Sequence, residues 1–190
     1  MTTADQQDAV RNGVDTTTLS ATLDAVARAP GVARFQFRAH NRWLSGTHSR
    51  STISDFHGVG EEREHEVTFV FDADHPAVLV GKDDGPTPVE YLLHALAACL
   101  TAGMAAIAAV RGITLHEVRS TVSGDIDLSG ALGSQQGVRN GFERIDVHVE
   151  VSGDGTPEQM RALVEESRNR SPVHDVITDR VPVDIRIDVA

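Results

Sequence analysis

The amino-acid sequence predicts an α+β fold in which antiparallel sheets surround one long buried helix. Three observations support this prediction. Several segments alternate apolar and polar residues with the period of a half-buried strand. Two segments, residues 87–90 and 156–159, carry a threonine, a proline and then a glutamate or glutamine in the order of a helix capping box. Between the strand-like segments lies an uncharged run of 20 residues, 91–110, that is too long for a strand.

In the first half of the chain the sequence predicts a short helix and then a series of strands. Residues 1–15 are polar and are expected to be disordered or loosely attached. Hydroxyl residues at positions 16–18 cap a helix that ends before Pro30. Strands follow where apolar residues alternate with polar ones or form a short apolar run. The expected strands are residues 34–40, 43–53, 66–71 and 77–80.

The strongest helix signal covers residues 88–111. Thr87 supplies the N-cap hydroxyl and Glu90 the carboxylate of a capping box, and Gly112 tolerates the left-handed conformation that ends a helix. The uncharged run is long enough to cross a bilayer. However, eight of its residues are alanine, and no cluster of Lys or Arg marks either end. We therefore expect a buried helix, apolar nearly all round, that a partner helix or a second subunit must cover.

The second half is expected to form a strand pair, a helix and a final strand. The pair comprises residues 118–128 and 145–151, antiparallel and separated by a loop over 129–141. The second capping box, at Thr156, opens a helix. Its inward residues are expected to be Met160, Leu163, Val164 and Ser167. Alternating apolar residues predict the last strand at 181–189.

The composition excludes several classes of protein. A length of 190 residues fits one ordinary domain or two very small ones. The net charge of −11 argues against a nucleic-acid or anionic-membrane surface. The single cysteine excludes an intrachain disulfide, and the polar N-terminus shows no secretory signal. No nucleotide-binding or metal-binding motif occurs, so we expect a soluble cytoplasmic protein without a metal or cofactor.

Cys99 is the residue with the clearest chemical potential. It shares a helix face with Leu92 and Gly103, so the simplest reading is a small buried hydrophobe. A reactive role needs the thiolate form, and the helix dipole cannot supply it because Cys99 lies roughly 17 Å from the helix start. A cation brought in by the fold is required instead. Arg42 and Arg50 are the candidates.

Five further residues carry reactive or ionisable side chains that have simpler structural explanations. The capping box accounts for Glu90, and His94 one turn later reads as an interior or interface histidine. Ser171, His174 and Asp175 are triad residue types, but their spacing reads better as a turn cap.

Residues 85–99, GPTPVEYLLHALAAC, resemble the start of the central helix in the OsmC/Ohr family. The residues in register with the family pattern are Pro88, Glu90, Leu92, Leu93 and Cys99. Residues 171–173, Ser-Pro-Val, look like the family's second motif, Cys-Pro-Val. The resemblance predicts an OsmC-like domain over residues 33–190, with residues 1–32 as an N-terminal extension that contains a short helix.

The resemblance implies an intertwined homodimer with thiol sites at the subunit interface, and reduction of organic hydroperoxides. It makes Cys99 the peroxidatic cysteine, Arg50 the activating arginine and Glu90 the glutamate that positions that arginine. His94, Arg42 and Ser171 are the expected substrate-binding residues, with Arg42 also the reserve for activation.

Two positions depart from the family pattern. Ser171 stands where the family has its resolving cysteine, so an intramolecular disulfide cannot form. In the organic hydroperoxide resistance branch a glutamate directly follows the helix proline, and here that position is Val89.

These departures leave three functional hypotheses. The first is a one-cysteine peroxidase in which an external thiol or dithiol reduces oxidised Cys99. The alternative is a non-peroxidase dimer that binds a small apolar or thiol-containing ligand at the subunit interface. A third is hydrolysis through Ser171 and His174.

Overall fold

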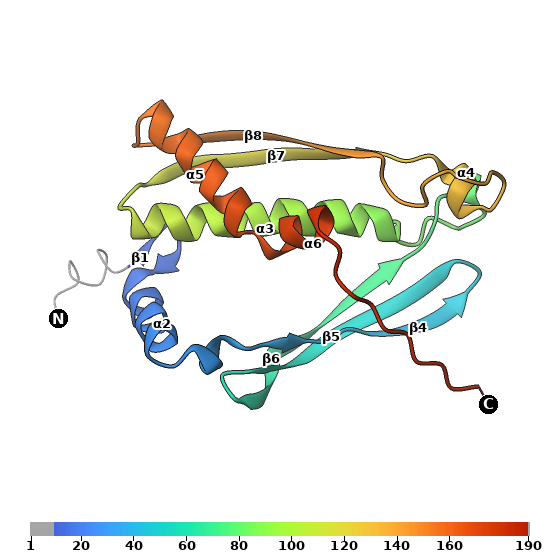
Figure 1. Ribbon diagram of the computed structural model, residues 1–190, viewed down its shortest axis with the longest axis horizontal. Coiled ribbons are helices and arrows are strands. Elements are labelled where there is room, and N and C mark those ends of the chain that lie inside the picture. Colours follow the sequence, from blue (N-terminus) through green and yellow to red (C-terminus); the bar gives the residue numbers. More distant parts are fainter. Residues whose placement is uncertain (1–9, 190) are drawn as a thin grey trace. The chain divides into compact units, whose positions relative to one another are not determined.

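The computed structural model describes residues 10–189, and these form two compact units (Figure 1). The first unit comprises Val10 and residues 15–92, and the second comprises residues 11–14 and 93–189. Helix α3 (Pro88–Val110) begins in the first unit and continues into the second. The boundary therefore falls inside the central helix, and the expected extension over residues 1–32 stays a prediction.

The N-terminal segment is more ordered than its polar composition suggests. Residues 1–9 lie outside the described residues, but β1 (Val10–Arg11) and β2 (Val14–Asp15) form a small sheet. Between them Asn12 donates to the Ile113 carbonyl at 2.9 Å and accepts from the Leu115 N–H at 2.9 Å. The expectation of a loosely attached segment is therefore wrong for residues 10–15, because a polar side chain pins the turn to the chain after α3.

The first unit continues with α2 (Thr16–Arg28), the short 3₁₀ helix η1 (Pro30–Ala33) and an antiparallel sheet. The predicted helix is confirmed, although its N-cap is Asp15, whose carboxylate accepts from the Thr18 N–H at 2.9 Å. The strands of the sheet are β3 (Gln36–Phe37), β4 (His40–Ser45), β5 (His48–Gly58) and β6 (Glu61–Ala73). Strand β5 pairs with each of the others.

Two predicted strands of this unit differ in the structure. Residues 34–40 contain only the two-residue β3, and β4 starts separately at His40. Residues 77–80 form the 3₁₀ helix η2 (Ala77–Leu79) instead of a strand. Pro76 begins this turn and Val80 ends it with a left-handed φ of 62°, so the chain curls back on itself. The strand prediction is wrong because a short apolar run fits either a strand or a turn.

The second unit follows the predicted order closely. Helix α3 ends at Val110, one residue before the predicted end, and Gly112 has the expected left-handed conformation with a φ of 72°. Strand β7 (Leu115–Asp125) pairs antiparallel with β8 (Arg144–Gly153). Helix α5 (Pro157–Arg170) opens with the predicted capping box, and α6 (Pro172–Thr178) follows it. The predicted strand end at Leu128 is wrong, since Asp127 caps the short helix α4 (Leu128–Ala131) there.

The hydrophobic core lies wholly in the second unit. Its buried residues come from α3, from the turn after α3 and from α5. They are Leu96, Leu100, Met104, Ile107, Ala108, Ile113, Met160 and Leu163. Partly buried apolar residues of β7 and β8 pack against this cluster. The inward positions predicted for α5 are thus confirmed, with Val164 half-buried.

Helix α3 is the one helix among the described residues that is long and apolar enough to cross a membrane, with a mean hydropathy of 1.9. A third of that stretch is buried inside the chain. The buried residues lie toward the second-unit core, whereas Leu92 and Val110 stay exposed. The expectation of a helix covered on more than one side is therefore only partly met by this chain.

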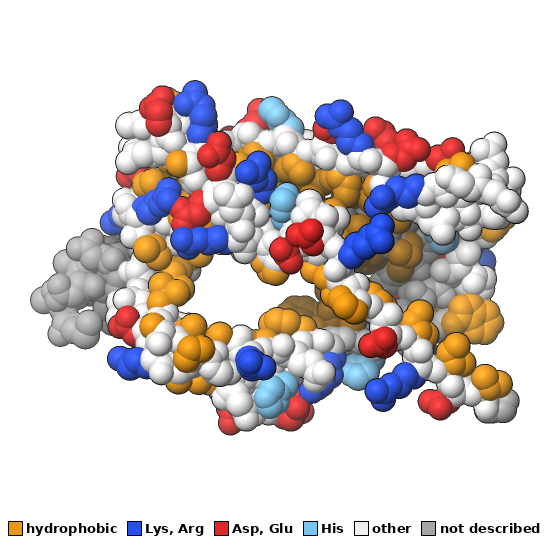
Figure 2. Space-filling view, in the orientation of Figure 1, with side chains coloured by type: hydrophobic (Ala, Val, Ile, Leu, Met, Phe, Trp, Pro, Cys, Tyr) orange, Lys and Arg blue, Asp and Glu red, His pale blue; other side chains and the backbone are white. Residues whose placement is uncertain are grey.

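The C-terminal segment does not form the predicted strand. Residues 180–189 are extended without strand pairing, and their apolar side chains stand out at the lower right of Figure 2. Val183, Ile185 and Ile187 are each about 80% exposed. The alternation is present, but within the described residues no strand edge supplies the hydrogen bonds that a strand requires.

Candidate functional site

The second unit brings Cys99 and Ser171 into direct contact. The Ser171 hydroxyl donates a hydrogen bond to Cys99 Sγ over 3.1 Å. Ser171 is buried at 4% exposure, and Cys99 is half-buried. The residue predicted at the position of the resolving thiol therefore lies beside the single cysteine, as a hydroxyl that hydrogen-bonds the sulfur but cannot form a disulfide with it.

Two contacts between α3 and α5 explain this placement. The Ser167 hydroxyl donates to the Leu100 carbonyl at 2.7 Å, and a Cβ added at Gly103 would lie only 2.5 Å from Ser167 Oγ. The two helices can approach this closely because Gly103 has no side chain. Ser171 follows Ser167 by one helical turn, and Cys99 precedes Gly103 by one turn, so the close approach continues to the thiol.

Ser171 also has the structural role that its sequence suggests. Its Oγ accepts from the backbone N–H of His174 at 3.1 Å, which caps the start of α6. The contact with His174 thus runs through the backbone and not through an imidazole base. This arrangement supports the turn cap that we predicted and gives the hydrolase hypothesis no general base at Ser171.

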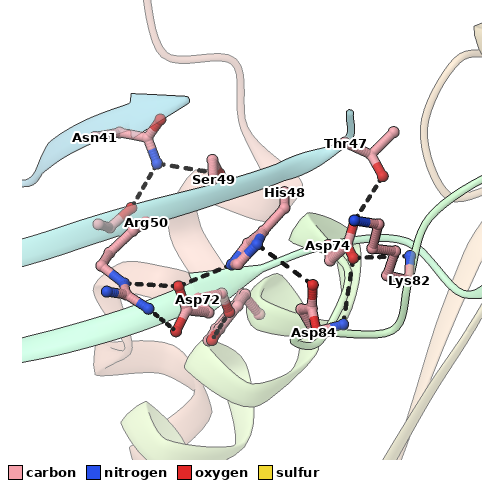
Figure 3. A network of polar contacts seen from close by, with 11 residues as sticks. Asn41, Thr47, His48, Ser49, Arg50, Asp72, Asp74, Lys82 and Asp84 are labelled. Carbon is pink, nitrogen blue, oxygen red and sulfur yellow. Dashed lines mark hydrogen bonds and ion pairs between the residues drawn. The ribbon is translucent and has the colours of Figure 1, made fainter. Parts of the chain in front are cut away.

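The first unit holds a polar cluster around Arg50 and Asp72, drawn in Figure 3. These two residues are direct partners across β5 and β6. Arg50 donates from Nε and Nη2 to the two carboxylate oxygens of Asp72, at 2.8 and 2.9 Å. His48 adds a contact from Nε2 to the same carboxylate at 3.0 Å. The Arg50 guanidinium and then His48 lower the pKa of Asp72 to about 2, against a smaller opposing effect of burial.

Neighbouring contacts hold this cluster in place. Tyr91, near the start of α3, donates from its hydroxyl to the Asp72 backbone carbonyl at 2.6 Å. His48 Nδ1 lies 3.5 Å from the Asp84 carboxylate. Asp74, only 1% exposed, accepts from the Thr47 hydroxyl at 2.5 Å and from the backbone N–H groups of residues 82 and 84. These bonds hold the pKa of Asp74 well below its usual range although burial opposes them.

The remaining predicted site residues have another partner or are exposed. Glu90 accepts from the Thr87 N–H and hydroxyl at 2.7 and 2.8 Å, so its carboxylate completes the capping box and its pKa is lowered. Arg42 is exposed and is the cross-strand neighbour of Arg50 on β4. His94 is exposed on α3. Arg50 and Cys99 belong to different units.

Sequence reasoning missed Asp72 as the partner of Arg50. The segment around Asp72 showed a strand pattern, but its register against β5 depends on the turn at residues 59–60 and on an irregularity after Ile53. No sequence signal revealed either feature.

Metal-binding and ligand-binding features are few in the described part of the chain. Between residues 10 and 189, no group of three or more His, Cys, Asp or Glu side chains could hold a metal ion. A groove of about 720 Å³ runs between β8 and α5 in the second unit. Its apolar lining residues include Val151, Met160 and Val164, and none of the predicted site residues lines it.

A family model described as OsmC-like protein matches residues 81–186, which is more than half of the chain. The chain belongs to the OsmC-like protein family. The resemblance of the central-helix motif is thereby confirmed, and the matched region includes both Cys99 and Ser171. Among curated proteins, no match to this OsmC-like protein was found.

Solved structures support the same fold. An OsmC-like protein from Mycoplasma pneumoniae has a TM-score of 0.59 at 16% identity, over 76% of this chain and 89% of that one. A putative osmotic stress induced and detoxification response protein from Psychrobacter arcticus 273-4 has a TM-score of 0.54 at 11% identity, over 72% and 85% of the two chains. At such identities the likeness establishes the α+β OsmC-like fold alone.

Proposed function

We propose that this OsmC-like protein is a one-cysteine, thiol-dependent reductase of organic hydroperoxides. The observation that carries the proposal is the 3.1 Å contact between Cys99 Sγ and the Ser171 hydroxyl. The only thiol of the chain is half-buried, and it contacts the residue that stands where the family has a second thiol. Because serine cannot condense with an oxidised sulfur, the reducing equivalents come from outside the chain.

The proposed reaction needs two equivalents of an external thiol. The Cys99 thiolate attacks the terminal oxygen of the hydroperoxide, the O–O bond breaks, and the leaving alkoxide takes a proton to become an alcohol. Cys99 is then a sulfenic acid. A first external thiol displaces water and forms a mixed disulfide with Cys99, and a second thiol, or the second sulfur of a dithiol, releases Cys99 as a thiolate. Overall, one hydroperoxide and two thiols give one alcohol, one water and one disulfide.

Arg50 supplies the cation that favours the thiolate in this proposal, and the Ser171 hydroxyl donates to the sulfur. Asp72 raises the pKa of Arg50, so the guanidinium stays charged at any relevant pH. His94 and Arg42 are proposed to contact the substrate, and Glu90 is proposed to act through the helix start that it caps.

We also propose that the protein works as a cytoplasmic homodimer. The support is the large apolar surface that the single chain leaves exposed on both units, including Phe37 and Trp43 at 72% and most of the C-terminal segment. Surfaces of this extent mark association sites in globular proteins.

The test is intact mass after one equivalent of cumene hydroperoxide is added to the reduced protein in the presence of dimedone, with Cys99→Ser as control. The proposal predicts rapid addition of one dimedone to the wild-type protein and none to the variant. An unmodified mass at excess peroxide would overturn it and favour the alternative, a non-peroxidase dimer that binds a small apolar or thiol-containing ligand.

A further inference from the structure

We propose that Ser171 is a catalytic residue of this protein, and that the start of α6 directs its single hydroxyl proton to Cys99 Sγ, where the bond stabilises the thiolate. The inference rests on the proposed function, because the thiolate of Cys99 is the form that attacks a hydroperoxide. It deepens that function by giving a role in the reaction to the position that lacks a second thiol. Both residues belong to the second unit.

The first argument is the direction of the hydroxyl proton. A serine hydroxyl has one proton to donate and two lone pairs with which to accept. Ser171 Oγ accepts from the backbone N–H of His174 at 3.1 Å, so one of its lone pairs faces α6. Among residues 10–189, Cys99 Sγ, also at 3.1 Å, is the one hydrogen-bond acceptor of this hydroxyl. The proton therefore points to the sulfur.

The second argument is that the backbone of Ser171 is held on both sides. Ser171 ends α5 and is also the N-cap of α6. Its N–H donates to the Arg168 carbonyl at 3.2 Å, and its carbonyl accepts from the Asp175 N–H at 3.0 Å. Pro172, the first residue of α6, has no N–H that could compete for the hydroxyl. The hydroxyl is therefore in place before the thiolate forms.

The third argument is the burial of this contact. Ser171 is only 4% exposed, so water has little access to its hydroxyl. A hydrogen bond is stronger when its acceptor is charged, and stronger again where water does not compete. The Ser171 hydroxyl thus stabilises the thiolate of Cys99 more than it stabilises the neutral thiol.

No ionisable side chain on the neighbouring helices of the second unit takes the place of this donor. Within residues 93–189, those of α3, of the last turn of α5 and of α6 form no hydrogen bond with Cys99 Sγ. They are His94, Arg168, Arg170, His174 and Asp175. Ser171 is therefore the hydrogen-bond partner that its own unit supplies to the sulfur.

The experiment measures the rate at which Cys99 reacts with iodoacetamide, a neutral alkylating agent, between pH 5 and 10, and its second-order rate constant with cumene hydroperoxide. Cys99 is the only cysteine, so both readouts report on one thiol. Ser171→Ala removes the donor and the cap, whereas Ser171→Asp keeps a strong cap but, when ionised, has no proton to donate. Ser167→Ala is the matched control, because Ser167 is also buried and its hydroxyl donates to a backbone carbonyl.

The inference predicts that Ser171→Ala is alkylated about tenfold more slowly than the wild type near neutral pH, with its profile moved to higher pH. At the alkaline end, Ser171→Ala should be at least as fast as the wild type, because a thiolate without this hydrogen bond is the stronger nucleophile. Ser171→Asp should be the slowest near neutral pH, since its carboxylate repels the thiolate. Ser167→Ala should keep the wild-type profile, and the rate constants with peroxide should follow the same order.

Two results would overturn the inference. A wild-type profile in Ser171→Ala or in Ser171→Asp would mean that Ser171 serves only as a helix cap. A change of rate that is the same at every pH, or the same in Ser167→Ala, would mean that the substitution only loosens the packing. Failure of the proposed function looks different. In that case the wild-type protein ignores cumene hydroperoxide, while the alkylation profiles still report whether Ser171 acts on the thiol.

Discussion

The two units of this protein differ in what holds them together. The second unit carries all of the buried hydrophobic residues that the structure describes between residues 10 and 189, and Leu163 and Met104 are at most 1% exposed. In the first unit the most buried side chain is a carboxylate, Asp74, and the aromatic residues of its sheet are half-buried or exposed. Its order within the chain comes from the β5–β6 ladder and from ion pairs.

This difference indicates that the two units have different roles. The unit with the core fixes the thiol, since close helix packing places Cys99 against Ser171. The unit without a core carries the ion pair of Arg50 and Asp72, and its exposed apolar side chains are where we propose that a second subunit binds. We therefore expect substitutions in the second-unit core to lower the stability of the protein more than substitutions in the first unit.

The largest expected effect is a complete change of product in Ser171→Cys. A second sulfur beside Cys99 should condense with the sulfenic acid and form an intramolecular disulfide, because the present Sγ–Oγ distance is already 3.1 Å. Mass spectrometry after one equivalent of peroxide should show the loss of two hydrogens and no dimedone adduct. Capture of dimedone at the wild-type level would mean that the two side chains do not face each other. Loss of the Ser171 cap should cost about 1 kcal/mol in stability.

Leu163→Ala should lower the free energy of unfolding by about 2–5 kcal/mol, because Leu163 is fully buried in the second-unit core. The same substitution in the first unit, Leu23→Ala, should cost less than about 1 kcal/mol, since Leu23 is 55% exposed. Urea unfolding of both variants measures the contrast. Equal losses of stability would contradict the difference between the two units and show that Leu23 in α2 is as well packed as Leu163 in α5.

Phe69→Asp tests the proposal that a second subunit binds the exposed apolar side chains of the first unit. Phe69 shares one face of β6 with Val67 and Phe71, and all three are exposed in the single chain. A charge there should weaken the homodimer at least about tenfold, or about 1.4 kcal/mol. Sedimentation velocity over a range of concentrations should show a species of twice 20.4 kDa for the wild type and more monomer for the variant. A variant that associates as tightly as the wild type would place the interface elsewhere.

The smallest effect should be the loss of stability in acid. The pKa of Asp72 falls from an ordinary 3.8 to about 2 on folding, so its contribution is present above about pH 4 and is lost as the pH falls toward 2. Urea midpoints at pH 7, 4 and 2.5 should therefore decline less steeply in Asp72→Asn than in the wild type. Parallel declines would mean that the ion pair adds nothing to the stability of the first unit.

The sequence predicted those features that depend on local pattern. Both capping boxes, the long helix and the β7–β8 pair follow from spacing alone, and Cys99 was found through its motif. Features that depend on register or on a neighbour were missed. The partner of Arg50 is set by strand pairing, and the strand expected at residues 181–189 has no edge to join within the chain.

The central proposal is that Cys99 reduces organic hydroperoxides and that Arg50 is the cation that activates it. Its most direct test is the second-order rate constant for Cys99 oxidation by cumene hydroperoxide in the wild type, in Arg50→Ala and in Arg38→Ala, whose arginine also pairs with an aspartate of the same sheet. The account predicts that Arg50→Ala is at least about tenfold slower and that Arg38→Ala stays within about twofold of the wild type. Equal rates for the two variants would contradict it.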